Sequence, residues 1–341
     1  GKYAEAMEFY EQALEFDPDF GRAYSGLALS AHALGKTEQA DELWKKALST
    51  LGVMTERERL RTLGLYYSLV TKNYQKAIET YELLVSKYPA DDTAHNGLAV
   101  QYFYTLDFKA ALEEGAVLLD IYPSSVMGRS NYALYAMYAT DFDTAVAEAE
   151  KVRELDPEYF KAWLPTAIKA LSDGDTEAAK AAYAEMVPMG VRGELTAQLG
   201  LADAAIYGGD YATARSLFDT GVALAQSAGS QYFEATMRIG LAEAMMLAPL
   251  DGDDVSAALL EAVETSGGLS RQVPAALMYM TIGEAESARL VAESLRSNLQ
   301  PQSRAYAALI DGLLALGDGD SITALESITA GVALADLWLL R

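Results

Sequence analysis

Three clusters built around Asp-Gly-Asp come nearer to a metal site than anything else in this 341-residue chain. They lie at residues 173–175, 251–254 and 318–320. A calcium loop needs oxygen ligands at alternating positions and a bidentate Glu at its end, and none of the clusters supplies that pattern. A Gly in a left-handed turn, followed by an Asp that caps the next helix, explains the same residues. The spacing therefore predicts turns, with no metal and no cofactor.

Few other groups could do chemistry. His32 and His95 are the only histidines and Cys is absent, which excludes Cys nucleophiles, zinc ribbons and disulfides. The sequence has no Walker loop, no His-Glu-x-x-His and no nucleophile elbow. Residues 19–21 read Asp-Phe-Gly, the magnesium-binding tripeptide of kinases, but no His-Arg-Asp or Gly-rich loop accompanies them. We therefore expect a protein that is not an enzyme, with both histidines in packing or surface roles.

The composition limits the partners of this chain. It has 26 Lys and Arg against 49 Asp and Glu, a net charge of −23, which disfavours nucleic acid and anionic membranes. The charge is spread evenly, with −11 in residues 1–180 and −12 in the rest. No apolar run reaches the ~18 residues of a membrane span. A protein or peptide partner that is basic or neutral, rather than acidic, is the better expectation.

Internal repetition decides the fold class. Pro89, Pro123 and Pro157 follow apolar helical stretches at equal intervals along the chain, and Pro18 closes an earlier stretch. Between them a small residue is followed by an aromatic or small residue four positions later and an apolar residue three further on, as in Ala77, Tyr81 and Leu84. This periodicity predicts pairs of amphipathic helices that bury their apolar stripes only by stacking.

These residues resemble the tetratricopeptide repeat. The resemblance implies an all-α fold, a right-handed α-solenoid of antiparallel helix pairs. We expect a single solenoid over 1–341 of about ten repeats, with the first repeat half present. Residues 1–225 match well and residues 226–341 are degenerate. After an orphan helix over 1–16, pairs are expected to begin near residues 21, 56, 92, 126, 160, 195, 230, 269 and 303.

Irregularities interrupt the repeat pattern at two places. The charged run 55–61 is expected to extend a first helix that Thr55 caps, and residues 249–254 to form an enlarged turn. Both ends look truncated, and residues 336–341 resemble the opening of a further first helix. Glycines are expected at the turns within repeats, namely Gly35, Gly174, Gly209, Gly283 and Gly319.

In the tetratricopeptide family the first helices line a concave face that binds partners, and the resemblance implies candidate contacts there. An alternative is that these side chains only pack between repeats. Of the family's five-residue clamp for a peptide carboxylate, only Asn131 and Lys161 match, which disfavours that ligand. The candidates are Arg59, Tyr66, Asn96, Val100, Phe103, Tyr104, Ser130, Leu134, Met137, Tyr138, Lys161 and Ile168.

Some sequence segments, here called phrases, are similar to the C-terminal repeat region of bacterial serine/threonine kinases of the eukaryotic-like type. They include residues 54–64, 88–91, 95–99, 131–135 and 304–306. The resemblance implies a bacterial interaction scaffold that binds a protein or peptide, or the sensory arm of a receptor-type kinase. It favours an extracytoplasmic (periplasmic) location over a cytoplasmic one, with attachment to a membrane protein. A structural subunit that packs through repeat edges in a filament or larger assembly is the alternative.

Overall fold

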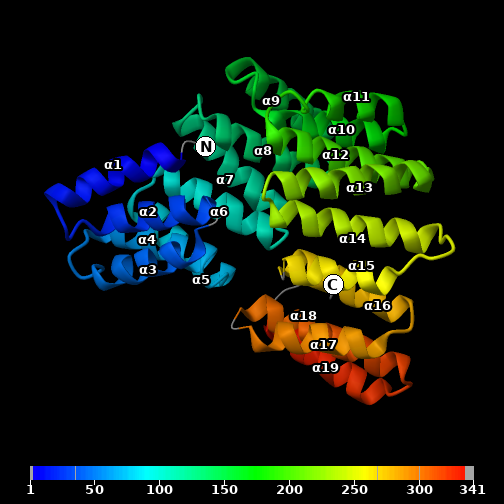
Figure 1. Ribbon diagram of the computed structural model, residues 1–341. Helices are drawn as coiled ribbons and strands as arrows, with labels where there is room; N and C mark the ends of the chain where they lie inside the picture. Colours follow the sequence, from blue (N-terminus) through cyan, green and yellow to red (C-terminus); the bar gives the residue numbers. More distant parts are fainter. Residues whose placement is uncertain (1–2, 35, 267, 299, 335–341) are drawn as a thin grey trace. The chain divides into compact units, whose positions relative to one another are not determined.

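The computed structural model describes residues 3–34, 36–266, 268–298 and 300–334. The chain divides into two compact units, Gly1–Tyr122 and Pro123–Arg341, and each is described by itself. Nineteen α-helices and one short 3₁₀ helix make up the regular structure of the described residues (Figure 1).

Unit 1 holds the first seven helices. They are α1 (Tyr3–Phe16), α2 (Gly21–Ala33), α3 (Thr37–Ser49), α4 (Glu56–Leu69), α5 (Tyr74–Lys87), α6 (Asp92–Tyr104) and α7 (Phe108–Ile121).

Unit 2 holds the remaining helices. They are α8 (Val126–Tyr138), α9 (Phe142–Leu155), η1 (Phe160–Trp163), α10 (Leu164–Ser172), α11 (Thr176–Ala184), α12 (Val191–Tyr207), α13 (Tyr211–Ser227), α14 (Gln231–Leu247), α15 (Val255–Thr265), α16 (Leu269–Thr281), α17 (Ala285–Ser297), α18 (Pro301–Gly317) and α19 (Ser321–Leu334).

Within both units the even-numbered helices are first helices, and each packs against the odd-numbered second helix that follows it (Figure 1). The first helices begin within a few residues of the predicted starts, and η1 opens the pair predicted near residue 160. The all-α solenoid of antiparallel helix pairs is thus confirmed. That the whole chain forms one continuous solenoid stays a prediction, as does truncation of its ends. Residues 336–341 and Gly35 lie outside the described residues.

Aromatic rings of second helices pack against glycines of first helices. Tyr81 of α5 is 1% exposed, and a Cβ added at Gly64 or Gly97 would lie 2.5 Å or 2.6 Å from its ring. Tyr183 faces Gly200 in the same way, and Phe218 faces Gly240. The ring fills the space that the missing side chain leaves, so each aromatic–glycine contact ties a repeat to its neighbour.

The short turns within repeats use a left-handed residue. Gly174, Gly209, Gly283 and Gly319 have positive φ, as predicted. Three equivalent turns of successive repeats have no glycine: Lys72, Leu106 and Thr140 adopt φ of 52°, 63° and 63°. The Asp-Gly-Asp clusters are turns too, because Asp175 and Asp254 each cap the helix that follows by accepting a backbone N–H.

Side chains near the start of several first helices tie them to their own second helices. The Nδ1 of His95 on α6 lies 2.6 Å from Glu114 Oε2 on α7, and its Nε2 lies 2.9 Å from the carbonyl of Pro89. Arg129, at the equivalent position of the next repeat, donates to Glu148 and to the carbonyl of Pro123. His95 is buried in this contact, so it has the packing role predicted for it.

The charged run at residues 55–61 forms the start of α4. The Thr55 side chain accepts from the Glu58 backbone N–H, and the Glu58 carboxylate accepts from the Thr55 N–H, which completes a capping box. The predicted cap is confirmed. The helix itself is only 14 residues long, and the additional residues of this repeat lie in the connection 50–55.

Asp91 joins two neighbouring first helices. It precedes α6 and is fully buried. Its carboxylate accepts hydrogen bonds from the Ala94 N–H at 3.0 Å and, from α4, from Arg57 Nε at 2.7 Å and Arg61 Nε at 2.9 Å. Burial acts to raise the pKa of Asp91, but the hydrogen bonds from the two arginines and the backbone outweigh it and hold that pKa below its usual value. Two of the phrases noted in the sequence, 54–64 and 88–91, are therefore in contact.

Candidate functional site

Most of the twelve candidate residues reach solvent on the helices of their own unit. Arg59, Tyr104, Tyr138 and Lys161 are exposed. The partly exposed candidates are Tyr66, Asn96, Val100, Phe103, Leu134, Met137 and Ile168. Ser130 is different, because it is only 2% exposed and packs inside its repeat. A side chain this buried presents little surface to a partner, and the predicted contact of Ser130 with one stays a prediction.

Two candidate tyrosines present large ring surfaces to solvent at equivalent positions of successive repeats. Tyr104 of α6 and Tyr138 of α8 are 54% and 55% exposed. In unit 1 the Tyr104 ring stacks on Tyr74, with centroids 5.2 Å apart and planes 12° from parallel. This stack provides a flat apolar surface whose rings are held in place by one another.

Asn96 places an amide at the same face of unit 1. Its Oδ1 atom is buried and has no hydrogen-bond partner among the described residues. A buried polar atom without a partner costs free energy. Because protein atoms cover this Oδ1 atom, a ligand reaches it only if the Asn96 side chain moves.

Lys161 of η1 lies close to a second cation, Arg192 of α12. Burial of the ammonium by surrounding protein atoms lowers the pKa of Lys161, and the charge of Arg192 lowers it further, although the side chain still reaches solvent. Neither residue forms an ion pair within the described part of the chain. These two cations are therefore close together, while Glu194 adds a negative charge in the same first turn of α12.

Asp203 and Glu243 are surface residues that the sequence analysis missed. Each follows by three residues a glycine that receives an aromatic ring, Gly200 on α12 and Gly240 on α14, so the two carboxylates occupy equivalent positions on first helices that pack together. Val100, Leu134 and Ile168 are each the ninth residue counted from the predicted helix starts at 92, 126 and 160, and Asp203 is the ninth from the start at 195. That continuation is the signal that could have found the pair.

The Asp203 carboxylate is in an unfavourable environment, although its side chain is exposed. The protein atoms around it reduce its solvation, and the charge of Glu243 repels it, which together raise the pKa of Asp203 to about 6. Among the described residues neither carboxylate takes part in a hydrogen bond or an ion pair. The two carboxylates therefore have no cationic partner among the described residues, and a bound cation would reduce their repulsion.

We expect Asp203→Asn to raise the melting temperature of the protein at pH 7 and to leave it unchanged near pH 3. A carboxyl whose pKa is higher in the folded state than the ~3.9 of the unfolded chain destabilises the fold once it ionises, so the benefit appears as the pH rises from about 4 to 6. Thermal unfolding followed by circular dichroism across this pH range checks the expectation. An equal effect of the variant at both pH values would contradict it.

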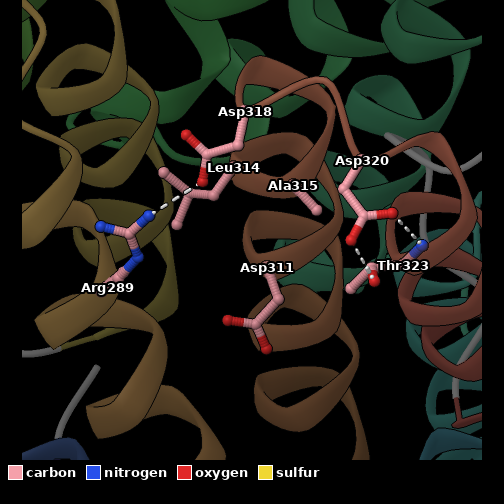
Figure 2. A pocket seen from close by; sticks show the side chains of 7 residues that line it. All are labelled: Arg289, Asp311, Leu314, Ala315, Asp318, Asp320 and Thr323. Atoms are coloured by element: carbon pink, nitrogen blue, oxygen red, sulfur yellow. Dashed lines mark hydrogen bonds and ion pairs between the residues drawn. The ribbon is translucent and has the colours of Figure 1, made fainter.

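A cavity of about 300 Å³ between α17, α18 and α19 does not have the features of a binding site (Figure 2). Its charged groups already have partners. Arg289 donates to Asp318 at 3.2 Å, and Asp320 accepts from the backbone and hydroxyl of Thr323. The Asp311 carboxylate accepts a hydrogen bond from the Arg296 guanidinium at 2.5 Å. No group of His, Asp or Glu that could hold a metal occurs in the described residues.

Three segments match family models of the tetratricopeptide repeat, at residues 1–20, 62–91 and 133–190. In these three segments the chain is similar to the tetratricopeptide repeat. Proteins with this repeat generally mediate protein–protein interactions, and no catalytic family is indicated. No curated protein sequence matches the chain. No helix among the described residues is both long and apolar enough to cross a bilayer.

Several solved structures are similar to this chain at low identity. Yeast Tom70 shares 15% identity over 98% of this chain and 85% of its own, with a TM-score of 0.47. TTC0263 of Thermus thermophilus shares 17% over 56% of this chain and all of its own, also with a TM-score of 0.47. MamA shares 14% over 51% of this chain and 94% of its own, with a TM-score of 0.42.

Proposed function

We propose that this chain is a non-enzymatic interaction module that binds a peptide or protein segment through the exposed face of its first helices. The observation that carries the proposal is the repeated exposure of large rings there, at Tyr104 and Tyr138. Exposed aromatic surface with adjacent polar groups is typical of peptide-binding surfaces. In unit 1 the partly exposed Asn96 lies on the same helix as Tyr104.

The test is a pull-down with the immobilised chain and a variant carrying Tyr104→Ala and Tyr138→Ala. We expect the variant to lose most of the specifically recovered protein, because each ring contributes about 1 kcal/mol or more to a contact centred on it. The matched control carries Leu83→Ala and Leu290→Ala, which remove exposed apolar side chains from second helices. Equal recovery by all three proteins would contradict binding through the first helices.

A narrower proposal is that the module is the sensory arm of a receptor-type bacterial kinase, located outside the cytoplasm. It is supported by the phrases at residues 54–64 and 88–91. Contact of these phrases through Asp91 also gives them a structural explanation, which weakens this support. The upstream coding sequence tests the proposal, because a kinase domain and a membrane span must precede this segment if it is correct.

A preference for a basic or neutral partner is also part of the proposed function. The net charge of −23 favours association with a basic segment, and added salt should slow it. Affinity that does not change over a wide range of salt concentration would contradict the electrostatic part.

A further inference from the structure

Two neighbouring first helices of unit 2, α12 and α14, present matching pairs of side chains. Asp203 and Tyr207 lie four residues apart on α12, and Glu243 and Leu247 lie four residues apart on α14. Residues at this spacing lie on one face of a helix. The helices α12 and α14 pack together, and the two pairs hold equivalent repeat positions. We call these four side chains the acidic–apolar face.

The apolar half of this face is open to solvent. Tyr207 is 63% exposed and Leu247 is 47% exposed, each at the end of its helix. An aromatic ring and an aliphatic side chain next to carboxylates match the two parts of a Lys or Arg side chain. The aliphatic stem packs on apolar atoms, while the charged end reaches a carboxylate or lies over the ring.

The acidic half lacks a counterion such as the one that the other acidic residue of α14 has. Glu234, on the same helix, is paired with Arg238 at 3.0 Å. Asp203 and Glu243 repel each other instead, and neither has an ion-pair partner among the described residues. A cation placed between them would remove this repulsion, so charge complementarity selects the kind of partner.

We propose that the acidic–apolar face binds a Lys or Arg side chain of a peptide segment in which basic residues alternate with apolar ones. The proposal rests on the proposed function, that the first helices bind a peptide or protein, and specifies where in unit 2 it does so and which partner chemistry it selects. The face is distinct from the pair formed by Lys161 of η1 and Arg192 of α12, whose cations would attract the opposite charge.

The test uses three short peptides, acetylated and amidated at their ends and labelled with fluorescein. One alternates Lys with Leu, the second alternates Glu with Leu, and the third alternates Lys with Ser. Fluorescence anisotropy measures their affinity for the intact chain and for the variant Asp203→Asn/Glu243→Gln. The matched control is Asp219→Asn/Glu293→Gln, which removes the same charge from exposed positions on second helices.

We expect the Lys/Leu peptide to bind most tightly, and the variant at the acidic–apolar face to weaken it by about tenfold while the control changes it by less than about twofold. Equal weakening by both variants would reduce the effect to net charge and overturn the proposal. Preferential binding of the Glu/Leu peptide, lost in Lys161→Met, would overturn it as well.

Lowering the pH provides a second readout. The groups that interact with Asp203 are Glu243 of α14 and Tyr183 of α11, and the Asp203 carboxyl is protonated as the pH falls below about 6. Peptide lysines stay charged in this range. Affinity for the Lys/Leu peptide should therefore fall between pH 7.5 and 5 in the intact chain and change little in Asp203→Asn/Glu243→Gln. A flat profile in the intact chain would count against the proposal.

Binding at the acidic–apolar face and binding elsewhere on the first helices give different results in these experiments. If the Lys/Leu peptide binds but Asp203→Asn/Glu243→Gln has no effect while Tyr104→Ala or Tyr138→Ala abolishes binding, the acidic–apolar face is overturned and binding through the first helices stands. If none of the peptides binds and the pull-down recovers no partner, both proposals fail.

Discussion

Replacing Tyr81 with Ala is expected to lower the free energy of unfolding by about 4 kcal/mol, which is as much as a buried aromatic contributes in a tightly packed core. The Tyr81 ring is 1% exposed and fills the space between Gly64 of α4 and Gly97 of α6. Removing it leaves a void against both glycines, and their backbones cannot close it without moving whole helices. The loss therefore affects the interface between two repeats as well as one side chain.

Urea denaturation followed by circular dichroism checks this expectation. Leu83→Ala is the matched control, because it removes an exposed apolar side chain from the same helix and should change the stability by less than about 0.5 kcal/mol. Because repeat proteins can lose cooperativity between neighbours, a separate early transition is a second expected sign of the damage. If Tyr81→Ala behaves like Leu83→Ala, the ring does not hold the repeats together.

Replacing Asp91 with Ala is expected to cost about 3 kcal/mol at pH 7, because it leaves Arg57 and Arg61 without their shared carboxylate and removes the cap of α6. Asp91→Asn should cost less, since Asn also caps helices and only the charge is lost. Asp92→Ala is the control: Asp92 is half exposed and forms an exposed ion pair with Arg61 at 3.2 Å, so its loss should be small.

The contribution of Asp91 depends on pH in a defined direction. Its pKa is lower in the folded protein than in the unfolded chain, so its charge stabilises the fold above the unfolded value of about 3.9 and this benefit disappears as the pH falls through the folded value. The difference in stability between the intact protein and Asp91→Asn should therefore be largest near neutral pH and shrink below about pH 4. A difference that stays constant down to pH 2 would show that the charge is not involved.

Much of the local structure follows from short-range rules in the sequence. The regularly spaced prolines end helices because Pro cannot continue their hydrogen bonding, and Thr55 and Asp175 cap the helices that follow them. The alternation of small and aromatic residues marks second helices, and their register sets where first helices begin. These features depend on neighbours within about one repeat, so the amino-acid sequence is sufficient to locate the helix pairs.

Turn conformation shows where such rules stop. Glycine indicates the left-handed residue at position 174, but Lys72, Leu106 and Thr140 adopt the same conformation without it. The regular repeat spacing places them in equivalent turns, and packing of the flanking helices imposes the conformation on side chains that do not prefer it. A residue type therefore predicts the turn only where it agrees with the packing.

The candidate site was determined partly by the sequence and partly by the tertiary structure. The sequence by itself established the fold class and the helix pairs, because the repeat register is set by residues within about one repeat. Only the tertiary structure showed that Ser130 is buried, that Asp91 joins α4 to α6, and that Asp203 meets Glu243 without a counterion. The physical reason is that burial and charge pairing depend on side chains about one repeat away in sequence, on neighbouring helix pairs. No local sequence pattern specifies how closely those helix pairs approach each other.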